Sequence, residues 1–339
     1  MEAKDRPKRI DMTKVSPKVL LFSTILFIVI FLLIVLGGGK DGYTEKGISE
    51  TKKTQWGQVP GQTQTSSVPS VAENLVDAVA EIYFFDVGQS DSVLCRLPEG
   101  IDILIDAGSW SETERVKNDL KALGVKNLKY LIISNPLSEE TGAAADLIKA
   151  GIVEAVCLPE TPEETQARSE EITAAAAANG IPVDYPEQNE VLYENRDCDL
   201  TLSVLSPKQS WKDSQNYSLV MKLEVGETSF LLMGTAGEPM EQALSDTRQN
   251  VAADVLKVGN HGASTGTTVD FLEQVNPSCC VISVSEDPLK KTPSEEIINR
   301  ITGRNIQLYR TDRDGSVRIQ TNGSQLAVSM MGEKGGKTR

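Results

Sequence analysis

From residue 81 onward, short apolar strands alternate with amphipathic helices, and this alternation limits the fold more than any other feature of the chain. Strands are predicted at 81–87, 91–96, 101–105, 129–133, 153–158, 199–205, 218–225, 228–233, 253–258, 278–284, 305–309 and 316–321. Helices are predicted at 112–123, 139–150, 163–179, 237–245, 267–274 and 293–301. So many strands exceed one comfortable sheet, and the intervening helices indicate parallel or mixed pairing. The sequence therefore predicts an α/β domain of two face-to-face sheets with helices outside. We expect five apolar strand residues to be buried in it: Leu104, Ile132, Leu231, Val255 and Ile282.

An uncharged apolar run, Val19–Leu36, precedes this domain. Its 18 residues, at about 1.5 Å each, nearly span a ~30 Å hydrocarbon core. A cleaved signal peptide would have a shorter apolar region, of about 7–15 residues, followed by an A-x-A-like site, and neither applies here. A buried core helix does not fit the charged flank and the glycines at 37–39. We therefore expect one transmembrane helix that acts as a signal-anchor.

Charge is spread unevenly along the chain. Residues 1–40 carry seven Lys/Arg and three acidic residues, a surplus of four positive charges. The net charge of the whole chain is −14, so the remaining residues carry a net charge of −18. Because the excess of Lys/Arg lies before the apolar run, the N-terminus should be cytoplasmic and the C-terminal domain extracytoplasmic in a single-pass cell-membrane protein. The acidic body, without a basic patch containing interleaved aromatic residues, argues against nucleic-acid binding.

Five regions follow from these patterns. The stretch before the domain is rich in Gly, Thr, Ser, Gln and Pro, which is typical of a disordered tether with a reach of roughly 35 Å. The expected organisation is a cytoplasmic basic tail at 1–18, a transmembrane helix at 19–36, a disordered linker at 37–78, the folded domain at 79–330 and a flexible tail at 331–339.

The five cysteines form no C-x-x-C pair. Cys95, Cys157, Cys279 and Cys280 lie in predicted apolar strands, so we interpret them as small core residues. Cys198 is expected to be the more exposed one. An odd number of cysteines outside the cell implies at least one free thiol or an intermolecular bond.

Several segments of the domain, in colinear order, resemble one known family. They are Phe84–Gly108 (FFDVGQSDSVLCRLPEGIDILIDAG), Tyr130–Ala144 (YLIISNPLSEETGAA), Asn216–Glu238, Leu256–Val284 (LKVGNHGASTGTTVDFLEQVNPSCCVISV) and Leu308–Gly323. Together they resemble the metallo-β-lactamase (MBL) fold domain of the ComEC-type late-competence family. The resemblance implies a four-layer αβ/βα sandwich, in agreement with the strand and helix pattern, and a metal-dependent hydrolase.

The resemblance also implies where the metal ligands would be, and most of those positions are substituted here. At the family's H-x-H-x-D-H motif and its later ligand positions this chain has Asn135, Leu137, Glu139, Glu140, Thr235, Asn260 and His261, with Thr292 where a further family histidine precedes a proline. The first motif keeps Asp86, Gln89 and Asp91, and the next keeps Asp106. These residues, without Thr292, are our candidate site, interpreted as the remains of a metal centre with no catalytic residue.

The donor chemistry alone leads to the same expectation. A catalytic zinc needs about three N, S or O protein ligands, and a two-metal centre needs more. His261 is the single histidine, and Leu137 offers no donor atom, so zinc is not expected. Glu139 and Glu140, with Asp86, Asp91 or Asp106, could form an oxygen site for Mg²⁺ or Ca²⁺.

Each of these polar residues also has a structural explanation. The two glutamates would suit the first turn of a helix. Asp106, Asp86 and Asp91 would accept loop N–H bonds. His261 would donate to a neighbouring carbonyl. A serine nucleophile at Ser264 lacks any G-x-S-x-G elbow.

Three functions remain open from the sequence. The first is an extracytoplasmic pseudoenzyme that binds a small ligand or an envelope protein through the former active-site cleft. The second is a phosphodiesterase- or nuclease-like hydrolase with a nonstandard metal, as the family resemblance implies. The third is a structural module on the cell surface.

Overall fold

The computed structural model describes residues 75–162, 166–287 and 289–331. The predicted basic tail and transmembrane helix, most of the predicted linker and residues 332–339 lie outside these ranges. Within them, no helix combines the length and the apolar character needed to cross a membrane. The anchor at 19–36 therefore stays a prediction.

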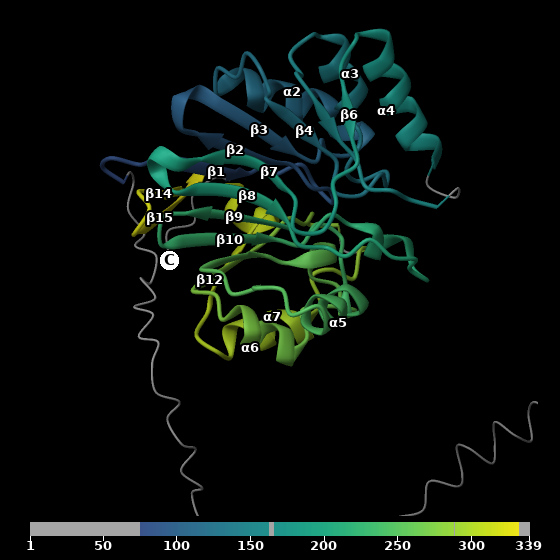
Figure 1. Ribbon diagram of the computed structural model, residues 1–339. Helices are drawn as coiled ribbons and strands as arrows, with labels where there is room; N and C mark the ends of the chain where they lie inside the picture. The colour runs from purple at the N-terminus through teal and green to yellow at the C-terminus, as the bar shows by residue number, and fades with distance from the viewer. Residues whose placement is uncertain (1–74, 163–165, 288, 332–339) are drawn as a thin grey trace, which may run out of the picture. The chain divides into compact units, whose positions relative to one another are not determined.

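Two mixed β-sheets form the centre of the described domain (Figure 1). The first has the strand order β15-β14-β1-β2-β3-β4-β5-β6, and the second has the order β13-β12-β11-β10-β9-β8-β7. The strands of the first are β1 (Ala80–Phe84), β2 (Val93–Leu97), β3 (Ile101–Ile105), β4 (Tyr130–Ile132), β5 (Val156–Cys157), β6 (Val183–Asp184), β14 (Ser316–Thr321) and β15 (Leu326–Met331). Those of the second are β7 (Val191–Asn195), β8 (Leu200–Val204), β9 (Met221–Val225), β10 (Thr228–Leu232), β11 (Val255–Lys257), β12 (Cys279–Ile282) and β13 (Gln307–Arg310).

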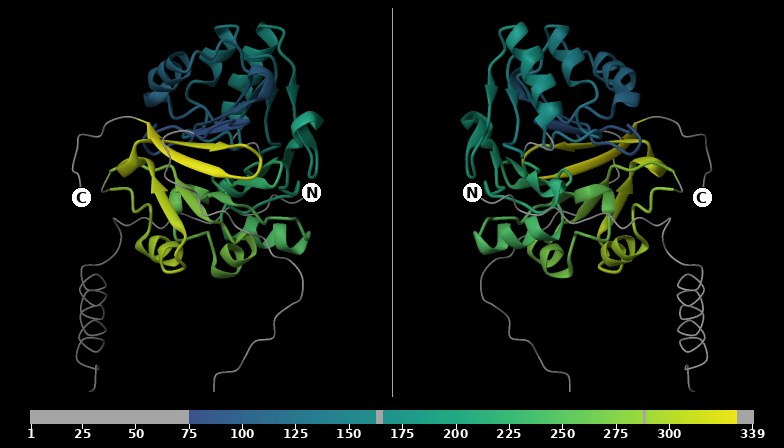
Figure 2. Two further views of the ribbon diagram at one scale, coloured as in Figure 1. Left: turned by 90° about the vertical axis from the view of Figure 1, so that its left-hand side faces the viewer. Right: turned by 90° about the vertical axis from the view of Figure 1, so that its right-hand side faces the viewer.

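Helices cover the outer face of each sheet, which gives four layers (Figures 1 and 2). On the first sheet lie α2 (Thr113–Ala122), α3 (Ala144–Lys149) and α4 (Gln166–Ala178). On the second lie α5 (Glu238–Asp246), α6 (Val269–Val275) and α7 (Glu295–Thr302), and the short α8 (Thr311–Asp314) follows β13. The predicted arrangement of two face-to-face sheets between helices is thus confirmed for the described domain.

The apolar residues divide between three cores because successive side chains of a strand point to opposite faces. In β3, Ile103 and Ile105 pack between the two sheets, whereas Leu104 packs under the helices of the first sheet. In β10, Phe230 faces the space between the sheets and Leu231 faces the helices of the second. Burial on both faces explains why these strands read as nearly continuous apolar runs.

The expected core residues and cysteines are where the sequence places them. Leu104, Ile132, Leu231, Val255 and Ile282 are fully buried. Four cysteines (95, 157, 279 and 280) are buried in strands, and Cys198 is partly exposed. All five thiols are free in the structure.

Each predicted strand has a counterpart, and the described residues contain three further strands that were not predicted. β6 has only two residues, too few for a periodic signal. The edge strand β7 has no buried side chain and so lacks an apolar alternation. β15 is the edge strand that pairs with β14 and follows it through a short hairpin.

The predicted helix at 139–150 needs correction. The helix α3 begins only at Ala144, and the preceding residues form turns. Glu139 and Glu140 therefore do not occupy a helix's first turn, and the helix dipole does not explain them. The loop instead holds the Glu140 side chain inside the protein, fully buried.

Candidate functional site

The candidate residues gather where the strands of the two sheets end. β3 and β4 are parallel in the first sheet, and β10, β11, β12 and β13 are parallel in the second. Because the carboxyl ends of parallel strands meet at one edge of a sheet, the loops after them lie together. These loops carry Asp106, Asn135, Glu140, Thr235 and His261.

A buried ion pair joins the two sheets in this region. Asp91 lies between β1 and β2, and Lys257 is the last residue of β11 in the other sheet. The Lys257 Nζ is 2.6 Å from Asp91 Oδ2, and neither side chain is more than 2% exposed. Lys257 was missed by the sequence analysis. The available signal was a charged residue between apolar neighbours in a buried strand, where a lysine needs a charged partner.

Asp106 occupies the turn after β3 with a positive φ of 62°. Its carboxylate accepts two hydrogen bonds from Ser134, at 2.7 Å from the backbone N–H and 2.8 Å from the hydroxyl. The prediction that Asp106 accepts a loop N–H bond is confirmed, with a donor from the loop after β4. Burial, and next the nearby Asp91 carboxylate, raise the pKa of Asp106 to about 8.

Glu140 is the residue whose polar atoms are least accounted for. Both of its carboxylate oxygens are buried and have no hydrogen-bond partner among the described residues. Burial raises the pKa of Glu140 well above its usual value, and the carboxylates of Asp106 and Asp91 raise it further. A buried acceptor without a partner costs free energy, more so when it is charged.

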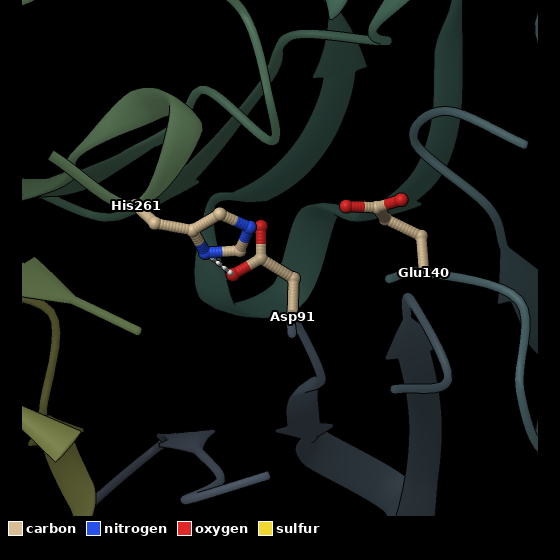
Figure 3. A group of neighbouring side chains, drawn as sticks. All are labelled: Asp91, Glu140 and His261. Atoms are coloured by element: carbon tan, nitrogen blue, oxygen red, sulfur yellow. Dashed lines mark ion pairs between the residues drawn. The ribbon is translucent and has the colours of Figure 1, made fainter. Parts of the chain in front are cut away.

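His261 points into the same space from the turn after β11 (Figure 3). Its Nδ1 is 2.9 Å from the Ser283 carbonyl oxygen, which can only accept, so Nδ1 carries the proton and donates. This confirms the expected donation to a neighbouring carbonyl. The same Nδ1 lies 3.8 Å from Asp91 Oδ1. His261 thus has an acidic neighbour that the sequence did not reveal.

Asn135 and Thr235, at two positions matched to family ligands, are bonded to each other. The Asn135 amide donates to Thr235 Oγ1 at 3.1 Å and to the Ser214 carbonyl at 2.8 Å. The Thr235 hydroxyl in turn donates to the Gln215 carbonyl at 3.2 Å. The Asn135 amide nitrogen and the Thr235 hydroxyl are therefore bonded within the protein, whereas Asn135 Oδ1 is buried without a hydrogen-bond partner among the described residues.

The other substituted positions offer little to a metal. Leu137 is half-buried and purely hydrocarbon. The carboxylate of Glu139 is partly exposed and accepts a bond from the adjacent Ser138 hydroxyl at 2.9 Å. Asn260 has a φ of 46° and uses its backbone N–H to hold the Gly234 carbonyl.

Two residues of the first motif brace neighbouring segments. The Asp86 carboxylate pairs with Arg115 of α2 at 3.1 Å. The Gln89 amide nitrogen donates to Thr292 Oγ1 at 2.9 Å, and its oxygen accepts from Ser285 at 3.3 Å. Thr292, where the family has a further histidine, is thus committed to a structural bond.

An open cavity of about 350 Å³ lies beside these loops. Its lining includes Gln89, Ser138 and Glu139, which lie within two residues of Asp91 or Glu140 in the sequence. Trp110, which is 79% exposed, forms part of its wall. An exposed indole next to polar groups is suited to contact a ligand.

The residues present do not fit the two-zinc centre that the family resemblance implies. Such a centre needs several N, S or O ligands and a bridging group. Here Leu137 lacks a donor, and Asn135 and Thr235 are bonded to each other. Ser264 is exposed, and the Nδ1 of His261 is bonded to Ser283, so a serine–histidine nucleophile is not assembled either. What the site does assemble is a trio, Asp91, Glu140 and His261, with ligand atoms within 4.8 Å of one another.

Two mixed sheets packed between layers of helices, with polar loops at their strand ends, define a four-layer αβ/βα protein. Its homologues belong to the ComEC-type late-competence family. They include ComE operon protein 3 of Bacillus subtilis (29% identical, covering 71% of this chain and 33% of the relative) and competence protein ComA of Neisseria gonorrhoeae (26%, 71% and 32%). Recombination protein 2 of Haemophilus influenzae is 28% identical over 69% of this chain and 28% of the relative. The chain spans about a third of the length of these relatives. No protein-family model matches it.

Solved structures similar to this chain include proteins with several activities. CmlA, a diiron β-hydroxylase from Streptomyces venezuelae, is 10% identical with a TM-score of 0.48, covering 73% of this chain and 55% of that one. A metallo-β-lactamase from Cronobacter sakazakii is 18% identical with a TM-score of 0.36, covering 51% and 72%. A diphosphatase of the PhnP family is 15% identical with a TM-score of 0.42, covering 68% and 84%. These likenesses concern the fold alone.

Proposed function

We propose that this competence-related protein is a non-hydrolytic member of its family that binds a ligand or an envelope protein through the cleft at its strand ends. The observation that carries the proposal is the hydrogen bond between Asn135 and Thr235. Two positions at which the family resemblance implies metal ligands are thereby turned toward each other. The two-metal hydrolytic centre that the family resemblance implies would need both as donors to the metals.

The cleft keeps features suited to binding. The cavity beside Gln89 and Glu139 is open to solvent, and Trp110 offers an exposed aromatic surface. Its wall includes both acidic and basic side chains, Glu112, Glu139, Arg168 and Lys290. Mixed charge and an indole favour a polar ligand or a protein surface. The strongly acidic body argues against a nucleic-acid backbone.

One observation favours a second candidate, hydrolysis with a nonstandard metal. Asp91, Glu140 and His261 offer three buried ligand atoms. Three protein ligands and an open position are the usual minimum for a catalytic metal. The two candidates differ in turnover.

The test is a phosphodiesterase assay of the full-length protein in detergent, with bis(p-nitrophenyl) phosphate and added Zn²⁺, Mn²⁺ or Mg²⁺. We expect rates no higher than those of Glu140→Gln and His261→Ala prepared in parallel. Metal-dependent turnover that both substitutions abolish would replace the proposal with the hydrolase. Turnover that survives both substitutions would come from a contaminant, and further purification should remove it.

We also propose that residues 19–36 anchor the protein, with the domain outside the membrane. The uncharged apolar run and the Lys/Arg excess before it support this topology. Deleting residues 1–40 should release a soluble protein, and protease added to intact cells should cleave within 40–78. Protection of that segment in intact cells, or sedimentation of the deletion variant with membranes, would refute the anchor.

A further inference from the structure

The trio Asp91, Glu140 and His261 comes from three separate loops and meets in the protein interior. Asp91 lies between β1 and β2, Glu140 precedes α3, and His261 follows β11. All three residues are buried, and one ligand atom from each lies within 4.8 Å of the other two. Figure 3 shows the Asp91 carboxylate between the imidazole ring and the Glu140 carboxylate, with the side chains pointing toward one another.

Three acceptor oxygens of this trio have no partner. Both oxygens of Glu140 and Oδ1 of Asp91 are buried without a hydrogen-bond donor among the described residues. Buried polar atoms are almost always satisfied, so three unsatisfied acceptors in one place point to a group that the polypeptide does not supply. The oxygens of an ionised carboxylate only accept, so the group that would satisfy all three together carries positive charge or donates protons.

The nearby ammonium does not fill this role. Lys257 Nζ is bonded to the other oxygen of Asp91, Oδ2, at 2.6 Å and lies 3.4 Å from the Gly234 carbonyl. Among the described residues no hydrogen bond joins it to Glu140, and its charge acts on that carboxyl only through space. One ammonium thus lies among three buried carboxyl groups, those of Asp91, Asp106 and Glu140.

The spacing of the trio suits one metal ion. Hard divalent cations bind oxygen at roughly 2.0–2.6 Å, so two ligands on one ion are about 3 Å apart when adjacent and about 4–5 Å apart when opposite. The upper limit of 4.8 Å among the three ligand atoms lies within this range.

The histidine is already in the tautomer that a metal requires. Nδ1 donates its proton to the Ser283 carbonyl, which leaves the lone pair of Nε2 free. Metal-binding histidines usually donate their other ring N–H to a carbonyl or carboxylate in this way, and the bond fixes the ring orientation.

We propose that Asp91, Glu140 and His261 hold one divalent cation of the Mn²⁺ class. Carboxylates suit Mg²⁺, Ca²⁺ and Mn²⁺, and an imidazole ligand shifts the preference within this group toward Mn²⁺. Asp91 belongs to the retained first motif and not to the substituted ligand motifs. The ion is single because Leu137 has no donor atom and Thr235 is bonded to the Asn135 amide nitrogen, so that Asn135 Oδ1 alone does not make a second set of ligands. Its binding does not depend on the proposed lack of hydrolysis, since an ion can bind without turnover.

The experiment uses the full-length protein in detergent, stripped with EDTA and titrated with Mn²⁺ while free Mn²⁺ is measured by electron paramagnetic resonance. We expect one Mn²⁺ per chain, with nitrogen hyperfine coupling from one imidazole. Glu140→Gln and Asp91→Asn should each weaken binding by more than about tenfold, and His261→Ala should also abolish the nitrogen coupling. Glu139→Gln, which changes the adjacent, partly exposed carboxylate, is the matched control and should bind like the wild type.

A second readout protects against variants that fail to fold. Glu140→Gln removes a buried carboxylate without partners, so its melting temperature in EDTA should equal or exceed that of the wild type. Mn²⁺ should raise the melting temperature of the wild type and of Glu139→Gln, but not that of Glu140→Gln. Absence of Mn²⁺ binding at millimolar concentration would overturn the proposal. Binding that Glu140→Gln leaves unchanged would also overturn it.

Discussion

Lys257 and Asp91 link the two sheets through one buried ion pair at the candidate site. Removing one partner leaves the other charge buried and unpaired, which costs about 3–5 kcal/mol. We therefore predict that Lys257→Met lowers the free energy of unfolding by that amount in urea titrations with EDTA. The exposed pair Lys129–Glu154 offers the control, and Lys129→Met should cost less than about 1 kcal/mol.

The double variant Lys257→Met/Asp91→Asn tests whether the Lys257 ammonium stabilises the fold through Asp91. Because it has no unpaired charge, it should recover much of the stability lost in Lys257→Met. Equal losses in the single and double variants would show that the ammonium acts through packing and not through Asp91.

Asp106 should make the fold more stable in acid than at neutral pH. Its pKa rises from 3.8 to about 8 on folding, so between these values the folded state keeps a proton that the unfolded chain releases. The stability it contributes is fully present below about pH 4 and is lost as the pH rises through about 8. The urea concentration at the unfolding midpoint of the wild type in EDTA should therefore decrease as the pH is raised from 5 to 8. The decrease should be smaller in Asp106→Asn.

The exposed Asp270 serves as the control for this pH dependence. Asp270→Asn should keep the wild-type slope. If Asp106→Asn had the same slope as well, the carboxyl of Asp106 would not be the titrating group.

At single residues, the sequence was informative where bonding is local. Asp106 and His261 occupy turns directly after strands, and each makes the kind of bond predicted from that position. Lys257 and Glu140 were not understood, because their environment is built from segments far apart in the sequence. The Lys257–Asp91 pair joins residues separated by 166 positions.

At the level of elements, the segment between β4 and α3 is held against the turn after β3. The Gly142 N–H donates to the Gly108 carbonyl at 2.6 Å, and the Ala143 N–H donates to the Ala107 carbonyl at 3.0 Å. A Cβ atom at Gly142 would lie 2.1 Å from the carbonyl carbon and oxygen of Ser109. Only glycine permits this approach, and the approach fixes the loop that carries Glu140.

We predict that Gly142→Ala lowers the free energy of unfolding by about 3 kcal/mol or more, because backbone must move to admit the methyl group. Gly124→Ala, where nothing lies within 4 Å and only the positive φ opposes the side chain, should cost about 1–2 kcal/mol. Chemical denaturation of both variants measures the difference. Equal costs would mean that the contact with Ser109 does not constrain the loop.

The elements themselves were predictable to the extent that they are buried. Strands such as β3 and β10 contact a core on each face, so their sequences are apolar throughout. β7 has no buried residue and is set in place by its pairing with β8, which no local pattern reveals. The start of α3 was misplaced because Glu139 and Glu140 mimic a helix N-terminus, whereas the packing of Gly142 delays the helix to Ala144.

At the scale of the whole domain, the last strands of the described chain join the sheet of the first one. β14, near the C-terminal end of the described residues, pairs with β1 and completes the first sheet after the second has been built. Thr228 of β10 and Thr321 of β14 share a buried hydrogen bond of 2.7 Å between the two sheets. No cut in the sequence separates the sheets, so the domain should unfold as one unit.

We predict that Leu231→Ala, under the helices of the second sheet, and Leu104→Ala, under those of the first, each cost about 2–5 kcal/mol. Both should shift a single transition, measured by near- and far-ultraviolet circular dichroism with coinciding midpoints. Two separate transitions, with each variant affecting only one, would contradict a single cooperative domain.

The central claim is that bonds within the chain replace a two-metal centre, which leaves room for one cation at most. The most direct measurement is the number of metal ions per full-length chain, by mass spectrometry, after equilibration with Zn²⁺ or with Mn²⁺ and removal of free ions. The account predicts no more than one ion per chain with either metal, and its loss in Glu140→Gln but not in Glu139→Gln. Two tightly bound ions per chain would contradict it.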